Sequence, residues 1–522
     1  MMKSLKRTYV PYSLLGIPSA LAKPTLQFVI LIVIILSVKR CYAIEQLKDG
    51  GLRIGWSIED ITPAGPVSLT GQYYDRISTY VQSPLKVTAC AIESANEMGI
   101  KEQAIMVSVD LVEIPRVLQD SLKNRVKKQI PDFDVRKLFM NATHDHSAAN
   151  PDITTEYGKF LVTKACQAAV TAWNKRKPAG ISRVLGYAVV GHNRRAQYAN
   201  GTTEMYGATD RKDFIGMEGA TDPGVDMLYC WDLNMKLTGI IMNVSCPAQV
   251  TEARYYVSAD YWGEVRNYIQ KKFSTDVYIL PQCGAAGDLS PRDLPRGYRG
   301  GEPNMWDVPG IVEIGRRLAQ VIDATYPDAT KNIQTSPIFK HTVADVDLPR
   351  RKVTEKEYQK ALKIVTEIRS REPKDANSPN TAWNRFLKEM HDNEKIRDYG
   401  PWDNKESDFG IVKINERILN IYANQDKHPV YPVELHVIRI GDVAIASNPF
   451  ELYVDYGFAM KGRSKANQTF VVQLTGDYGD YLPTARAIPG GQYSALVSIV
   501  GPEGGQMLVD TTVNMINGMW GK

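Results

Sequence analysis

Four short apolar runs, each ending abruptly at polar or glycine-rich residues, constrain the fold more than any other feature of the sequence. The runs are residues 104–109, 138–142, 240–244 and 277–280. Because they are almost continuously apolar, we expect strands that are buried on both faces of a sheet. Helix-like segments alternate with them, so the sequence predicts an α/β fold with a mixed β-sheet core flanked by helices.

The candidate helices lie among these runs, and a charged segment follows them. The helices are predicted at residues 116–129, 156–175, 261–273 and 310–326. Residues 350–398 are dense in lysine, glutamate and arginine, which indicates a charged helical insertion on the surface. Strand-like runs resume at residues 433–440 and 443–447, and the glycine-rich segment 476–505 follows.

The N-terminus has the features of an export signal. Residues 28–38 form an apolar run of eleven residues behind a basic segment. Since about 20 apolar residues are needed to span a bilayer, this run is short for an anchor and has the length of a signal-peptide core. We expect residues 1–43 to be a signal peptide cleaved near Ala43, residues 44–522 to form a single domain, and the mature protein to be exported. An uncleaved leader that tethers the chain to a membrane is the alternative.

Charge and cysteine content exclude several other classes of protein. The formal net charge is +5, but residues 1–43 hold six basic residues and no acidic one, so the remainder is close to neutral. No nucleic-acid partner is therefore expected. The six cysteines are widely spaced and include no CxxC pair, which predicts neither a disulfide framework nor a zinc knuckle.

Two histidines occupy one tripeptide directly after an apolar run, in the segment Thr143-His144-Asp145-His146-Ser147. In extended backbone, His144 and His146 would point to the same side of the chain. Imidazole is a common zinc ligand and also transfers protons near neutral pH. The pair therefore predicts a metal or proton-transfer site, and a hydrogen-bonded pair of loop histidines is the alternative.

Two other strand-like runs end in candidate site residues. Ser290 follows the run at 277–280 and a series of small residues, where it could act as a nucleophile or donate to an oxyanion. A serine at such a position also caps a tight turn. Glu451 follows the run at 443–447 and suits a metal ligand. An exposed glutamate after a turn is the other interpretation.

Tyrosines and arginines supply the last candidates. Tyr481 and Tyr493 lie in the glycine-rich segment 476–505, where tyrosines could also simply pack. Arg194 belongs to the segment Gly191-His192-Asn193-Arg194-Arg195. An arginine there could hold a carboxylate or phosphate, or form an ion pair on the surface.

Together and in this order, these segments resemble the neutral (non-lysosomal) ceramidase family, specifically its N-terminal catalytic domain. The resemblance spans about residues 50–515. Its motifs are Asp60-Ile61-Thr62-Pro63, Thr143–Ser147, Asn193-Arg194-Arg195, Gly287-Asp288-Leu289-Ser290-Pro291, Pro449-Phe450-Glu451, Tyr478–Tyr481 and Gly501-Pro502-Glu503-Gly504-Gly505. Any one motif is a weak signal, whereas seven in order are specific.

The resemblance implies a zinc-dependent hydrolase of sphingolipid metabolism with ceramide as the family's substrate. Its partners would be a lipid or other small-molecule substrate and, for a lipid, a membrane surface. The family's zinc ligands fall on His144, Glu451 and Tyr481. The resemblance also implies residues that contact the substrate. His146 would lie at the substrate, and Ser290 would act as the nucleophile or bind the substrate's polar groups. Tyr493 would stabilise the oxyanion, and Arg194 corresponds to the arginine of the family's Asn-Arg motif.

One position departs from the family pattern. The family's second zinc histidine aligns with Cys246, in the segment Asn243-Val244-Ser245-Cys246-Pro247. Cysteine thiolate is a competent zinc ligand and would make the zinc a weaker Lewis acid. We therefore predict a Zn²⁺ site of His144, Cys246, Glu451 and Tyr481. The alternatives are that His192 supplies the second ligand or that the position has no equivalent.

The segment 350–398 has no counterpart in the family, and we expect the chain to lack the family's C-terminal immunoglobulin-like domain. The leading prediction is an exported hydrolase that cleaves an amide bond of ceramide or of another N-acylated substrate. Hydrolysis of an ester or glycosidic bond on the same fold is the first alternative. A non-catalytic binding protein is the second.

Overall fold

The computed structural model describes residues 51–95, 101–252, 254–296, 305–396 and 407–521. The predicted signal peptide and its cleavage point lie outside these residues. Within these ranges no helix is both long and apolar enough to cross a membrane.

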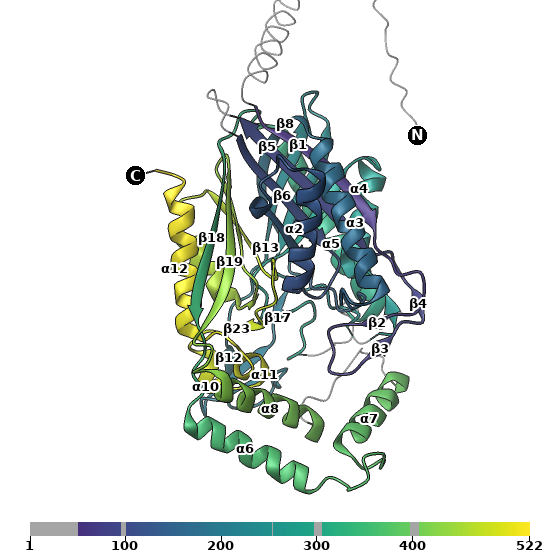
Figure 1. The fold of residues 1–522 in the computed structure, drawn as a ribbon, viewed down its shortest axis with the longest axis vertical. Helices are drawn as coiled ribbons and strands as arrows, with labels where there is room; N and C mark the ends of the chain where they lie inside the picture. Colours follow the sequence, from purple (N-terminus) through teal and green to yellow (C-terminus); the bar gives the residue numbers. More distant parts are fainter. Residues whose placement is uncertain (1–50, 96–100, 253, 297–304, 397–406, 522) are drawn as a thin grey trace, which may run out of the picture. The chain divides into compact units, whose positions relative to one another are not determined.

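The largest element is an eight-stranded mixed sheet (Figure 1). Its strand order is β16 (Tyr278–Cys283), β14 (Leu237–Val244), β13 (Gly224–Asp232), β8 (Lys177–Tyr187), β1 (Arg53–Asp60), β5 (Lys86–Ala95), β6 (Lys101–Val109) and β7 (Leu138–Ala142). The pairs β6–β7 and β14–β16 are parallel, and the other pairs are antiparallel. The predicted α/β class with a mixed sheet is confirmed.

The strands of this sheet are buried on both faces, as their continuous apolar pattern predicts. In β6, Ile105 and Val107 pack against the helical side, while Met106 packs against a second sheet. In β14, Met242 and Ile241 divide between the two faces in the same way. Successive side chains of a strand point to opposite faces, so burial of both faces removes the polar alternation.

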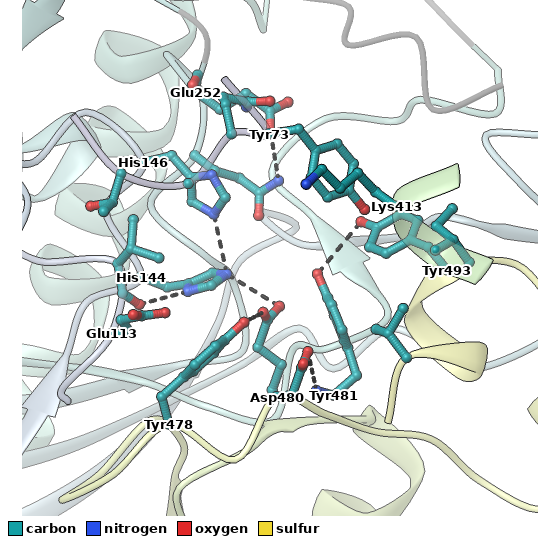
Figure 2. Close-up of a pocket in the computed structure, with 18 of the residues that line it drawn as sticks. Tyr73, Glu113, His144, His146, Glu252, Lys413, Tyr478, Asp480, Tyr481 and Tyr493 are labelled. Atoms are coloured by element: carbon teal, nitrogen blue, oxygen red, sulfur yellow. Dashed lines mark hydrogen bonds and ion pairs between the residues drawn. The ribbon is translucent and has the colours of Figure 1, made fainter. Parts of the chain in front are cut away.

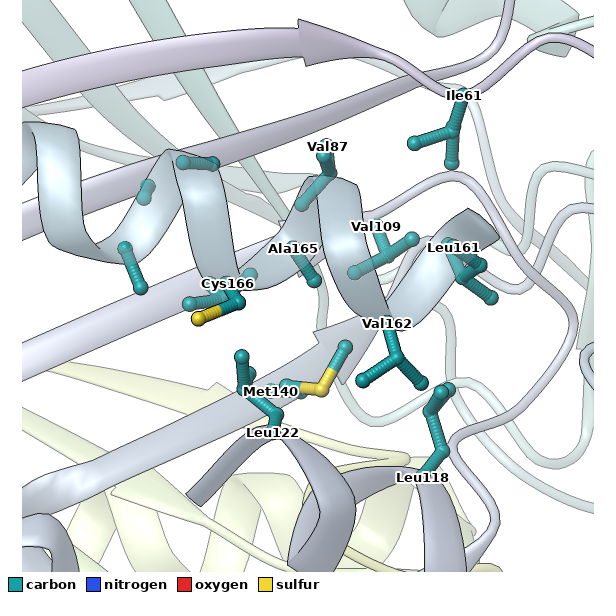
Figure 3. Packing of buried hydrophobic residues seen from close by; sticks show 14 of the residues in the cluster. Ile61, Val87, Val109, Leu118, Leu122, Met140, Leu161, Val162, Ala165 and Cys166 are labelled. Carbon is teal, nitrogen blue, oxygen red and sulfur yellow. The ribbon is translucent and has the colours of Figure 1, made fainter. Parts of the chain in front are cut away.

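Helices cover one face of the large sheet. They are α2 (Arg116–Gln129), α3 (Glu156–Asn174), α4 (Asp260–Lys272) and α5 (Asp307–Ala329), close to the bounds predicted for them. Figure 3 shows Leu118 and Leu122 of α2 and Leu161 of α3 packing with Val109 and Met140 of the sheet. This packing fixes the carboxyl ends of β6 and β7, from which site residues emerge.

A four-stranded sheet covers the other face. Its order is β18 (Phe339–Pro349), β19 (Val430–Ile440), β20 (Val443–Ser447) and β22 (Gln468–Val472). Apolar residues of both sheets, among them Phe139 and Ile438, form one buried layer between them. Helix α12 (Pro502–Gly518) packs on the outer face of this sheet through Ile516. The layers are therefore helix, sheet, sheet and helix.

The predicted helical insertion is present and longer than its sequence bounds. Helices α6 (Glu355–Ser370) and α7 (Ala382–Ile396) fall in residues 350–398, and α8 (Asp408–Asn424) follows them. All three lie between β18 and β19, which pair directly with Pro349 opposite Val430. The helical insertion, α6 to α8, thus grows from the tip of a long hairpin, below the strand ends in Figure 1.

The remaining elements are short. They are β2 (Ser68–Leu69), β3 (Arg76–Ile77), β4 (Tyr80–Val81), η1 (Val135–Lys137), β9 (His192–Asn193), β10 (Arg195–Tyr198), β11 (Thr203–Met205), β12 (Phe214–Met217), β15 (Tyr256–Val257), β17 (Leu289–Ser290), β21 (Glu451–Leu452), α9 (Val454–Arg463), β23 (Tyr481–Leu482), α10 (Ala487–Gly490) and α11 (Tyr493–Leu496).

Candidate active site

The strand ends and the helical insertion enclose a cavity of about 310 Å³. Backbone hydrogen bonds from Ala142 to Leu474 and from Gly476 to Met140 join the end of β7 to the segment after β22. Two sheets therefore contribute residues to one pocket. Its lining comprises Thr70, Gly71, Gln72, Tyr73, Val112, Glu113, His144, His146, Arg194, Gln249, Glu252, Lys413, Ile414, Arg417, Glu451, Tyr478, Asp480, Tyr481, Tyr493 and Val497.

The two histidines after β7 meet in this pocket (Figure 2). Their Nε2 atoms are 3.3 Å apart, and their rings are close to perpendicular. The predicted convergence of His144 and His146 holds, but not through extended backbone, because His144 has φ of 61°. This left-handed conformation costs about 1–3 kcal/mol, and such strain concentrates at functional sites.

The tautomer of His144 is set by a backbone carbonyl. Its Nδ1 lies 2.9 Å from the carbonyl oxygen of Val112, so Nδ1 carries a hydrogen and donates it. The Nε2 atom then points into the pocket, 3.3 Å from Oε2 of Glu451. Burial lowers the pKa of His144, but the carboxylate of Glu451 outweighs burial and raises it above its ordinary value.

Glu451 and Tyr481 are neighbours because β21 and β23 pair in parallel, with these two residues opposite each other. The Tyr478 hydroxyl donates to Oε1 of Glu451 over 3.3 Å. Burial raises the pKa of Glu451, but His144 and Arg194 together hold it below its ordinary value. The carboxylate is thus kept ionised within a buried site.

Arg194 lies behind the tyrosines. Its buried Nη2 donates to the carbonyl of Gly287 at 2.8 Å and to the hydroxyl of Tyr481 at 3.2 Å. The hydroxyls of Tyr481 and Tyr493 are 3.5 Å apart. The guanidinium therefore places a positive charge beside two phenols that face the pocket.

Three candidate site residues from the sequence, Ser290, His192 and Cys246, do not line this pocket. Ser290 pairs with His192 between β17 and β9, and its buried Oγ accepts a hydrogen bond from the Arg292 backbone N–H. This is the turn-capping role that was the alternative for Ser290. His192 is held in the same short ladder.

Cys246 is turned toward the helical side of the large sheet. Its thiol donates to the carbonyl of Val190 over 3.2 Å, and it packs with Tyr261 of α4 and Ile311 of α5. Burial raises the pKa of this thiol well above its usual value. The structure thus brings His144, Glu451 and Tyr481 together but leaves Cys246 outside, because the turn after β14 directs its side chain into the core.

Sequence reasoning missed several pocket residues. Glu113 follows β6, and β6 is the parallel neighbour of β7, so the carboxyl ends of the two strands lie at the same edge of the sheet. The sequence does not show that these two strands pair, so it could not place Glu113 near His144. Burial raises the pKa of Glu113 to about 7. Asp480, with φ of 62°, directly precedes Tyr481. Gly71 from the β2–β3 loop and Arg417 from α8 complete the walls, and neither has a local signal.

The pocket offers three possible ligands for a divalent metal, and one of them is a tyrosine. Within the described ranges, no three His, Cys, Asp or Glu side chains are grouped as a metal site would require. His144 and Glu451 supply a nitrogen and a carboxylate at short range, and Tyr481 is the adjacent oxygen donor. The Nδ1 hydrogen bond of His144 to a carbonyl is the support that metal-binding histidines commonly have.

Comparison of the sequence with protein-family models and with curated protein sequences gives no match. The structure is similar to that of neutral ceramidase from Pseudomonas aeruginosa, with a TM-score of 0.63 and 17% identity over 90% of this chain and 75% of that chain. It is also similar to a ceramidase complexed with C2, with a TM-score of 0.63 and 16% identity over 90% of this chain and 76% of that chain. The chain therefore has the fold of the neutral ceramidases.

Proposed function

We propose that this protein is a zinc-dependent hydrolase that cleaves the amide bond of an N-acylated substrate, of which ceramide is one example. The observation that carries the proposal is the arrangement of His144 and Glu451, whose facing atoms are 3.3 Å apart in the lining of the cavity. The shared fold with neutral ceramidases supports the same reaction class.

His144, Glu451 and Tyr481 would hold the metal. A bound zinc ion would lower the pKa of a coordinated water toward 7 and polarise the substrate carbonyl. The three residues come from separate strand ends that two sheets fix in place, so the site is preorganised before substrate binds.

The other pocket residues supply proton transfer and charge stabilisation. His146 is half-buried beside His144, where it would take a proton from the attacking water and return it to the departing amine. The Tyr493 hydroxyl would donate to the oxyanion of the tetrahedral intermediate. Arg194, next to Tyr481, would favour the developing negative charge. The products are a carboxylate and an amine.

We further propose that the protein is exported, on the basis of the apolar run at residues 28–38. An exported protein would meet lipid substrates at the outer side of a membrane.

The test is zinc content and hydrolysis of N-acylated substrates by wild type, His144→Ala and His146→Ala, with exposed His428→Ala as the control. We expect His144→Ala to lose both metal and activity. His146→Ala should keep the metal and lose about 10²–10⁴-fold in rate, and His428→Ala should match wild type. Full activity in His144→Ala would rule out the proposal.

A further inference from the structure

Lys413 of α8 is a charged residue of the pocket that the proposed reaction does not use. It is exposed and lines the same cavity as His146 and Tyr493. Within the described part of the chain it has no hydrogen-bond or ion-pair partner, and its Nζ lies 5.6 Å from the centre of the Phe409 ring. A solvent-accessible ammonium group therefore lines the cavity, and no described residue is its counter-ion.

Three of the acidic residues that line the pocket with Lys413 are already paired with other groups. Glu252 forms an ion pair with Arg292, and Asp480 forms one with Arg417. Glu451 is paired with His144. Among the described residues, these contacts leave Lys413 without a paired carboxylate.

The remaining wall carboxyl is on the opposite side. Figure 2 shows Glu113 beside His144, whereas Lys413 lies with Tyr73 and Tyr493. Among the described residues, Glu113 and Lys413 form no ion pair with each other.

The cavity that Lys413 lines also has apolar walls. Ile414 and Val497 supply aliphatic side chains to the same lining. A charge-assisted hydrogen bond is stronger where the local dielectric is lower. Lys413 also belongs to the helical insertion, so it adds a feature to the pocket that the two sheets do not supply.

We propose that Lys413 is a specificity-determining residue that binds an anionic oxygen group, such as a carboxylate, sulfonate or phosphate, on the amine portion of an N-acylated substrate. Hydrolysis of such a substrate rests on the proposed function, whereas binding of its anionic group by Lys413 does not. Water adds to the amide carbonyl, the C–N bond breaks, and the leaving amine takes a proton and retains the anionic group.

The experiment compares matched anionic and neutral substrates. N-lauroylglycine is paired with N-lauroylglycinamide, while N-lauroyltaurine and N-lauroylphosphoethanolamine distinguish sulfonate and phosphate from carboxylate. We expect wild type to favour the best anionic compound over the amide by about tenfold or more in kcat/KM, as for a hydrogen bond to a charged group. Lys413→Met should bring this ratio close to one, Lys413→Glu should invert it, and Lys413→Arg should keep it.

Lys360→Met is the matched control, because Lys360 is an exposed lysine of α6 that does not line the pocket. It should leave the preference unchanged. Circular dichroism verifies that each variant is folded. A preference that survives in Lys413→Met, or disappears equally in Lys360→Met, overturns the inference.

Calorimetric binding of the same compounds separates this inference from the proposed function. If none is hydrolysed, yet an anionic compound binds wild type about tenfold more tightly than the amide and Lys413→Met removes the difference, the reaction is wrong and the role of Lys413 stands. Equal affinity for the anionic and neutral compounds, or no binding of any of them, overturns the role of Lys413.

Discussion

The guanidinium of Arg417 forms an ion pair with the carboxylate of Asp480, the residue directly before Tyr481. Nε of Arg417 also donates to the carbonyl of Val497 at 3.3 Å. One residue of α8 therefore ties the helical insertion to the segment that carries a proposed metal ligand. The insertion is part of the site, not only a surface addition.

Replacing Arg417 by alanine should destabilise the protein and reduce activity. Asp480 is only 7% exposed and would lose its counter-ion, but Arg417 is itself partly exposed, so we expect a loss of about 1–2 kcal/mol in the free energy of unfolding. Urea unfolding measures this. Arg369→Ala is the control, because it breaks the exposed pair between Arg369 and Glu416 of α8 and should cost under about 0.5 kcal/mol. Equal losses in both variants would contradict the prediction.

Cys246→Ala should retain the zinc content of wild type. The thiol is directed at the Val190 carbonyl within the core and does not line the pocket, so its removal takes no donor from the site. Metal analysis of the purified variant, beside His144→Ala as the metal-free reference, checks this. A variant that loses zinc while remaining folded would show that Cys246 reaches the metal after all.

Gly71→Ala should reduce the rate of hydrolysis. Gly71 has φ of 99°, and an added Cβ would lie 2.4 Å from Nδ1 of His146, so the imidazole would be displaced. The matched control is Gly201→Ala, which has a similar φ of 82° but open space around the added carbon. Both should lose about 1–2 kcal/mol of stability from backbone strain, whereas only Gly71→Ala should lose kcat. A kcat loss shared by both would attribute the effect to strain alone.

A buried histidine pair should make a contribution to the stability of the protein that falls as the pH falls below about 6.5. His341 and His436 form a buried pair with Nε2 and Nδ1 3.1 Å apart. Burial lowers the pKa of both below the ordinary value of 6.5. At these two histidines the unfolded chain therefore binds more protons than the folded one in mildly acidic solution, so their contribution to the free energy of unfolding falls as the pH falls.

Each histidine should contribute at most about 1.4 kcal/mol per pH unit to the slope of the free energy of unfolding against pH. Urea unfolding at intervals of about half a pH unit between pH 5.0 and pH 7.5 measures this slope. His341→Gln, which cannot titrate, should lower the slope below pH 6.5 relative to that of wild type. Exposed His428→Gln should leave it as in wild type. A His341→Gln slope equal to that of wild type would refute the assignment.

The sequence alone predicted the α/β class and a mixed sheet with buried strands, but not the second sheet that covers one face of it. Continuous apolar runs such as β6 and β14 required two covered faces, and the helices packed on one of those faces end close to their predicted bounds. It also singled out His144 and Glu451, because polar residues placed shortly after buried strands lie at a sheet edge, whereas Tyr481 was identified only through the family resemblance. Local pattern is enough for these features because strand and helix periods are set within a few residues.

The tertiary structure decided which of these residues meet. Ser290 and Cys246 also follow buried strands, but short backbone ladders and the direction of the turn after β14 place them outside the pocket. Glu113, Lys413 and Arg417 enter it through strand pairing and the packing of α8, which bring distant parts of the chain together. Turn direction and long-range packing depend on the whole core, and for this reason no local pattern predicted them.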